Sequence, residues 1–193
     1  MILEEMGIEI HKNALAKGFW DNDKILGYQD DLCLRVALVH SELSELLEAV
    51  RKHIKVSEHI TEISGTEEEV ADCVIRLLDM NEGYNWKFFE CISGFDWSKS
   101  ISQLVVLAHS IVDNSTLERL YLIGYENHCG IEIGILHRIL SEFLMNDACI
   151  TMYKFIIHLF YCCGIYGWNI EKAIELKMNY NLSRSKMHGG KAF

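Results

Sequence analysis

The chain contains no proline in 193 residues, and this absence constrains the fold more than any other feature of the sequence. Proline is the strongest helix breaker, because it lacks a backbone N–H and clashes with the preceding turn. Half of the residues are hydrophobic, which is ample for a core. No segment alternates between apolar and polar residues with the period of two that strands show. We therefore predict an all-α fold, a helical bundle with a four-helix core, in a single domain over residues 1–193.

Apolar periodicity and glycine or polar breaks delimit the expected helices. They cover Leu3–Lys17, about Asp31–Lys52, Thr66 to about Glu82, and Trp86–Ile92, and residues 98–127 are expected to be a helical connection. The second of these helices has apolar residues at alternating steps of four and three, which is the stripe that a helix turns toward a core. The stripe consists of Leu32, Val36, Val39, Leu43, Leu46 and Val50.

Two pairs of carboxylates lie three residues apart on two of these helices, Glu42 with Glu45 and Glu69 with Asp72. Residues at this spacing share one helical face. Four carboxylates that faced one another would resist ionising together, and a divalent cation removes that conflict. Mg²⁺ prefers such oxygen ligands and also binds substrate phosphates. The pattern predicts a Mg²⁺ site, with Mn²⁺ as an alternative ion.

Simpler interpretations exist for the same acids. Acidic pairs at this spacing are common on solvated helix faces. Thr66 and Glu69 also fit a capping box, with Thr66 as the N-cap and Glu69 at the third helical position. Glu67 and Glu68 would then favour the positive end of the helix dipole.

The net charge of −10 argues against a nucleic-acid polymer as partner, since such partners need a basic surface. The seven cysteines include no CxxC pair, which favours neither a disulfide framework nor a zinc site. The N-terminus is acidic and amphipathic, unlike a signal peptide. Tyr153–Tyr166 is very apolar but contains Lys154 and His158 and is too short to span a bilayer. We expect a buried helix there, no membrane partner and a cytoplasmic location.

The second half of the chain echoes the first. Val39-His40-x-x-Leu43-Ser44-Glu45 is followed later by Leu136-His137-x-x-Leu140-Ser141-Glu142. In the second copy Ile139, Thr151 and Lys154 stand in place of three acids, and only Glu142 remains. The alternative is chance similarity between amphipathic helices. A tandem repeat predicts an acidic half at about 1–93 and a degenerate half with a basic tail at about 94–193.

Further motifs accompany the acids. Lys17-Gly18-Phe19-Trp20-Asp21 precedes them, and they are followed near the end by Glu175-x-Lys177-Met178-x-Tyr180-Asn181-x-x-Arg184 and by His188-Gly189-Gly190-Lys191. In this order, with ExxE at Glu42 and ExxD at Glu69, the chain resembles the all-α nucleoside triphosphate pyrophosphohydrolases, that is, the MazG-like proteins and the dimeric dUTPases. It departs from their pattern at Phe19, which replaces a tryptophan, and at Ser185, which replaces a proline. Residues at about 95–148 are not covered by the resemblance.

The resemblance implies Mg²⁺-dependent hydrolysis of a nucleoside triphosphate to a monophosphate and pyrophosphate, as housekeeping of the nucleotide pool. It implies metal binding by Glu42, Glu45, Glu69 and Asp72, with Glu42 or Glu45 as general base. It also implies substrate binding by Lys17, Trp20, Lys177, Asn181, Arg184 and Lys191, and it is compatible with a homodimer.

Several interpretations stay open. Trp20 suits a core or lid anchor as well as a substrate contact, and the basic tail suits a solvated helix end. His40 suits a structural role or a place behind the metal ligands. The substrate is either a range of nucleotides or deoxyuridine nucleotides alone, and a non-catalytic helical binding module is an alternative of another class. A di-iron bundle is disfavoured because no histidine follows a glutamate at the Glu-x-x-His spacing.

Overall fold

The prediction of an all-α protein is confirmed in the computed structural model, which describes residues 1–21, 27–92, 95–113 and 129–186. No strand occurs in these ranges. The helices are α1 (Leu3–Lys17), α2 (Tyr28–Lys52), α3 (Gly65–Gly83), α4 (Phe88–Cys91), α5 (Ile101–Asp113), α7 (Cys129–Ser141), the short 3-10 helix η1 (Glu142–Leu144), α8 (Ala148–Tyr166) and α9 (Ile170–Ser183).

Most predicted helix boundaries agree with the structure to within a few residues. The helix predicted over Trp86–Ile92 shortens to the four residues of α4. Asn85 and Lys87 have positive φ angles of 53° and 55°, in the left-handed region that interrupts a helix. Of the helical connection expected over 98–127, α5 covers the first part, and residues 114–128 lie outside the described ranges.

The N-cap residue of α3 lies two positions earlier in the chain than the sequence analysis predicted. Ser64 is the N-cap, and its hydroxyl accepts a hydrogen bond from the backbone N–H of Glu67. The Glu67 carboxylate in turn accepts from the backbone N–H of Ser64 at 2.9 Å, which completes a capping box. The capping box expected from Thr66 and Glu69 is therefore wrong, and Glu69 is free of a capping role.

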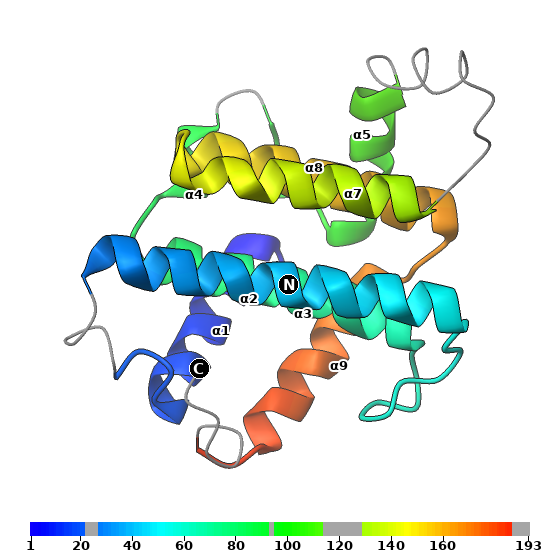
Figure 1. Cartoon of the computed structure of the whole chain (residues 1–193), viewed down its shortest axis with the longest axis horizontal. Helices are drawn as coiled ribbons and strands as arrows, with labels where there is room; N and C mark the ends of the chain where they lie inside the picture. The colour runs from blue at the N-terminus through cyan, green and yellow to red at the C-terminus, as the bar shows by residue number, and fades with distance from the viewer. Residues whose placement is uncertain (22–26, 93–94, 114–128, 187–193) are drawn as a thin grey trace.

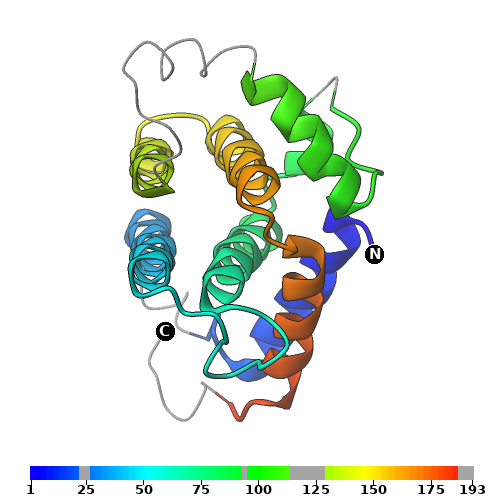
Figure 2. The same ribbon diagram turned by 90° about the vertical axis from the view of Figure 1, so that its right-hand side faces the viewer.

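Four helices, α2, α3, α7 and α8, pack in two pairs. Figure 2 shows them nearly end-on, with α7 above α2 and α8 above α3. α1 and α9 both pack against α3, and in Figure 1 they lie together below the α2–α3 pair. α5 covers α8. The space among these helices is filled by fully buried side chains that include Leu43, Leu46, Leu77, Phe155 and Phe160.

α8 is longer than the apolar run from which it was predicted. Among the described residues it is the helix that is long and apolar enough to cross a membrane by length and composition. About 67% of its apolar window is buried inside the structure, where it packs against α5 and α7. The expectation of a buried helix at this place is confirmed.

Gly83 provides a test of this packing. The indole of Trp20 lies on the last turn of α3, and a Cβ at Gly83 would stand 2.0 Å from the ring. Gly83→Ala should therefore displace Trp20 and lower the free energy of unfolding by about 1–3 kcal/mol, as overpacking does. Urea unfolding followed by tryptophan fluorescence would measure this loss.

Gly134 supplies the matched control. It lies within α7, and a Cβ there would meet nothing within 4 Å. Gly134→Ala should raise the free energy of unfolding by about 0.5–1 kcal/mol, since alanine favours helix. Equal effects of the two substitutions would show that Trp20 does not depend on Gly83.

Candidate functional site

A cavity of about 900 Å³ opens between α1, α2, α3 and α9. Its lining combines acidic, basic and apolar side chains. The acidic residues include Glu42, Glu45, Glu68, Glu69 and Asp72, the basic ones are Arg35, Arg76, Lys177 and Arg184, and the apolar ones include Phe19, Leu34, Leu38, Ile75 and Met178.

The four acids predicted to bind metal all line this cavity. α2 and α3 pack side by side, so the acidic face of each helix turns toward the other. Carboxylate oxygens of Glu42, Glu69 and Asp72 lie within 4.8 Å of one another. Glu45 lies one turn beyond Glu42, is exposed, and accepts a hydrogen bond from Ser41 at 3.3 Å. Three of the four acids thus form a cluster, and the fourth stands at its edge.

Two basic side chains contact the cluster. The Arg76 guanidinium donates through Nε to Glu42 Oε1 at 2.6 Å. The buried Lys177 ammonium lies 2.7 Å from Asp72 Oδ2 and also contacts Glu68. Lys177, which the family resemblance assigned to substrate, therefore bridges two acids of α3.

Among the acids of the cluster, Glu69 is the one whose carboxylate has no neutralising partner. It makes no hydrogen bond or ion pair with the other described residues. Burial and the neighbouring charges of Asp72, Glu42 and Glu45 raise its pKa to about 8. Burial also raises the pKa of Asp72 to about 6, against the opposing charge of Lys177. With all of its carboxylates ionised, the cluster would carry more negative charge than its protein surroundings stabilise, and a bound cation would compensate this charge.

Besides Lys177, two of the residues predicted to bind substrate line the same cavity, Asn181 and Arg184. Arg184 follows α9, and its guanidinium lies 5.5 Å from the ring centroid of Tyr180 without an ion pair to the other described residues. The side-chain oxygen of Asn181 is buried and has no hydrogen-bond partner in the described structure. Such a buried, unpaired acceptor is costly, and a ligand donor would satisfy it.

Lys17 and Trp20 do not line the cavity. The Lys17 ammonium donates to the backbone carbonyls of Leu182, at 3.0 Å, and Arg184, so it fastens the end of α1 to the end of α9. Lys191, the last predicted substrate residue, lies outside the described residues, as does His188.

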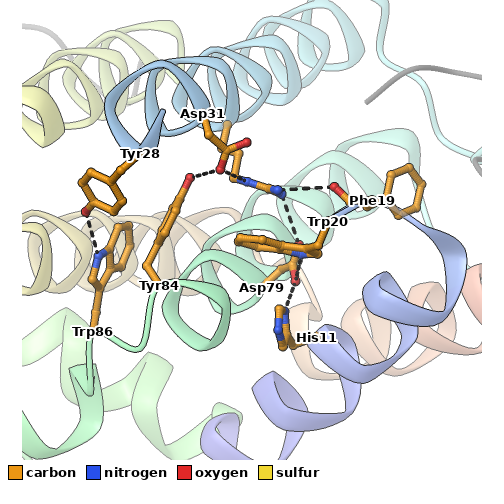
Figure 3. Close-up of polar contacts among 9 residues, drawn as sticks. His11, Phe19, Trp20, Tyr28, Asp31, Asp79, Tyr84 and Trp86 are labelled. Carbon is orange, nitrogen blue, oxygen red and sulfur yellow. Dashed lines mark hydrogen bonds and ion pairs between the residues drawn. The ribbon is translucent and has the colours of Figure 1, made fainter. Parts of the chain in front are cut away.

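Trp20 is a buried anchor beside the cavity (Figure 3). Its indole N–H donates to Asp79 at 3.0 Å, and the Arg35 guanidinium lies 3.3 Å from the centroid of its ring. Asp79 also contacts His11 Nδ1 at 2.7 Å. Asp79 thereby positions Trp20. It is not part of the acid cluster, although it lies on the same polar face of α3 as Glu69 and Asp72.

Three interactions near the site were not predicted from the sequence. Glu68 was assigned to the helix dipole but is buried and pairs with Lys177. Arg35 pairs with Asp31 at 2.8 Å, and the spacing of four residues was the available signal. His40 turns away from the cavity toward α7, where its Nδ1 lies 2.8 Å from that of His137. This contact agrees with the structural alternative for His40.

The raised pKa of Glu69 predicts how stability depends on pH. The folded state holds the Glu69 proton up to about pH 8, whereas the ordinary pKa is 4.5. Between these values the folded protein binds more protons than the unfolded chain, so this contribution falls as pH rises. In EDTA, thermal unfolding should show a loss on the order of a few kcal/mol from this group across that range.

Glu69→Gln should remove this pH-dependent loss, and the difference from wild type isolates Glu69 from all other groups. Glu142→Gln is the matched control, because Glu142 lies in η1 and pairs with Lys154 at 3.0 Å. The assignment fails if Glu69→Gln and wild type lose stability in parallel between pH 5 and pH 8.

Comparison with protein-family models, with curated proteins and with solved structures returned no match for this chain. The functional argument therefore depends on the residues of the cavity and on the motifs of the sequence.

Proposed function

We propose that the protein is a Mg²⁺-dependent nucleoside triphosphate pyrophosphohydrolase with a MazG-like all-α fold. It would convert a nucleoside triphosphate and water into the monophosphate and pyrophosphate. The observation that carries this proposal is the acid cluster in a cavity of about 900 Å³ that is also lined by basic and apolar side chains. Cavities of this size hold ligands as large as a nucleotide.

The acid cluster suits a hard divalent ion. It offers only carboxylate oxygens, and three of them come from rigid helices and lie within 4.8 Å of one another. The raised pKa values of Glu69 and Asp72 support the same conclusion, because a cation would let both ionise at neutral pH. Mg²⁺ bound there would neutralise phosphate oxygens and lower the pKa of a bound water.

The basic residues suit a polyphosphate. Arg184 has no ion pair among the described residues, and Arg76 keeps one carboxylate partner while about a third of its side chain is exposed. Phosphoryl transfer depends mainly on positioning and charge stabilisation, which such side chains supply. Arg184 and Arg76 would hold the phosphates next to the acids, where the bond between the α and β phosphates is cut.

The remaining lining suits a nucleoside. Phe19, Leu38, Ile75 and Met178 offer apolar surface to a base or sugar. The unpaired oxygen of Asn181 would accept a hydrogen bond from an amino, imino or hydroxyl group of the substrate.

Glu45 is the better placed of the two acids proposed as general base. Glu42 is held by Arg76, whereas Glu45 is exposed and accepts only one hydrogen bond, from Ser41. A carboxylate without a basic partner remains free to accept a proton from an attacking water.

Two contacts support a tandem repeat with a single site. His40 and His137 occupy equivalent positions of the two sequence echoes, and their rings stack with centroids 5.1 Å apart. Contact between equivalent residues is what an approximate two-fold axis between α2 and α7 would produce. In the second half Lys154 pairs with Glu142, so the one acid left there is neutralised. The second half would then complete the bundle, as a second subunit does in a dimer.

One observation favours a second candidate function, a nucleotide-binding module without hydrolysis. Arg76 and Lys177 already neutralise Glu42 and Asp72, two of the four acids. A module of this kind would bind nucleotide at the basic and apolar lining and would not depend on Mg²⁺. Turnover separates the two candidates.

The reaction itself is the first test. With Mg²⁺, at least one member of a panel of nucleoside triphosphates, including dUTP and damaged nucleotides, should yield monophosphate and pyrophosphate. Chromatography of the products would identify both. Release of orthophosphate alone, or binding without turnover, would contradict the proposal, and turnover of deoxyuridine nucleotides alone would narrow it to a dUTPase.

The acids are the second test. Glu42→Gln, Glu45→Gln, Glu69→Gln and Asp72→Asn should each lower the rate about a hundredfold or more, because each removes a charged metal ligand or the base. Glu142→Gln should leave turnover nearly unchanged. Circular dichroism would show that each variant keeps its helices, and a full-rate Glu69→Gln variant would remove Glu69 from the site.

A further inference from the structure

We propose that the protein has a second metal site, for Zn²⁺ or a similar borderline-soft ion, formed by Glu132, His158 and Cys162 between α7 and α8. Their possible ligand atoms lie within 4.8 Å of one another. All three side chains are buried, with exposed fractions of 7%, 6% and 2%. The site is independent of the proposed function, because none of the three residues lines the cavity.

The helices bring these residues together from two directions. His158 and Cys162 are four residues apart on α8, so they share one face of that helix. Glu132 faces them from α7, which packs against α8. The Glu132 carboxylate lies 2.7 Å from His158 Nε2, so the imidazole is already fixed in orientation.

The apolar surroundings make it costly to bury the polar side chains of Glu132 and His158, and a bound ion would offset this cost. Glu132 is the one acid of α7, and the neighbouring positions of α8 are almost all apolar and buried. A buried ion pair seldom stabilises a fold more than apolar residues of similar volume would. A thiol placed beside the pair adds a third ligand type, and a carboxylate, an imidazole and a thiolate together are a typical zinc set.

The dimensions fit a tetrahedral ion after small side-chain shifts. Zinc bonds of about 2.0–2.3 Å place neighbouring ligand atoms roughly 3.2–3.8 Å apart. The His158–Glu132 contact would open from 2.7 Å, and the distances to Cys162, which are at most 4.8 Å, need only small adjustments. With Glu132 and Cys162 each carrying one negative charge, the ion and its ligands would be neutral, which suits an apolar interior.

Binding of the ion changes the protonation of Cys162 and of His158. The Cys162 thiol gives its proton to solvent and becomes the thiolate ligand. His158 would bind as the neutral imidazole through Nε2, so the proton with which Nε2 faces Glu132 leaves this nitrogen and the ring carries its one proton on Nδ1. Burial and the Glu132 charge raise the pKa of this thiol, so the cation supplies the charge that holds the thiolate.

Water would complete the tetrahedron around the ion as the fourth ligand.

Cobalt(II) tests the site on the full chain. Co²⁺ replaces zinc and gives a thiolate-to-metal absorption band in the near ultraviolet when a cysteine is bound. We expect one equivalent of Co²⁺ to produce this band, one equivalent of Zn²⁺ to abolish it, and excess Mg²⁺ to leave it unchanged, because Mg²⁺ does not favour thiolate.

Substitutions assign the ligands. Cys162→Ser should lose the band, whereas Cys163→Ser is the matched control and should keep it, since the adjacent residue points to another side of α8. Glu69→Gln should also keep it, which separates this site from the cavity. His158→Gln and Glu132→Gln should each weaken Zn²⁺ at least tenfold in competition with a chelating dye.

Thermal unfolding gives a readout that does not depend on cobalt. Zn²⁺ should raise the melting temperature of wild type and Cys163→Ser but not of His158→Gln. The proposal is overturned if wild type shows no thiolate band at stoichiometric Co²⁺, or if Cys162→Ser keeps the band. It is equally overturned if Zn²⁺ raises the melting temperature of wild type and His158→Gln alike.

Discussion

The contact of Lys177 with Asp72 and Glu68 joins the end of the chain to its centre, and the candidate site depends on it. Two carboxylates on α3 would be costly to bury without a counter-charge, and the ammonium supplies one at 2.7 Å from Asp72. Because Lys177 is anchored there, the next turns of α9 bring Asn181 and Arg184 to the cavity. The Lys177 ammonium thus both neutralises the acids of α3 and positions α9. Removing the ammonium would leave Asp72 without its basic partner, would leave Glu68 with only Ser57 and His59, and would release the helix that carries the basic lining.

The sequence was sufficient for the helices and for the acid cluster. Apolar steps of three and four residues define α2 and α3, and the ExxE and ExxD spacings place each pair of acids on one face, where Glu42, Glu69 and Asp72 meet. These features are local, because helical periodicity alone decides them.

The partners of the polar side chains could not be predicted in this way. The cap of α3 was assigned to Thr66 because Thr66-x-x-Glu69 and Ser64-x-x-Glu67 have the same form, and only the path of the preceding loop selects Ser64. Lys177 was assigned to substrate from the family resemblance, and its acid partners on α3 could not be predicted because they are distant in sequence. The cluster of Glu132, His158 and Cys162 was missed because Glu132 has no second acid three residues away to mark it, and because His158 and Cys162 lie within an apolar run.

Trp20 determines how the cavity responds to its contents. Its ring lies on Gly83, under the Arg35 guanidinium and against Asp79, so the wall formed by α1, α2 and α3 at this end is locked by one indole. Another part of the lining is formed by Met178, Leu182 and Arg184, which are long side chains with many rotamers. The cavity is therefore stiff on one side and compliant on the other. Ligands of different widths would be accommodated by movement of α9 side chains alone, with no shift of the helices that hold the acids.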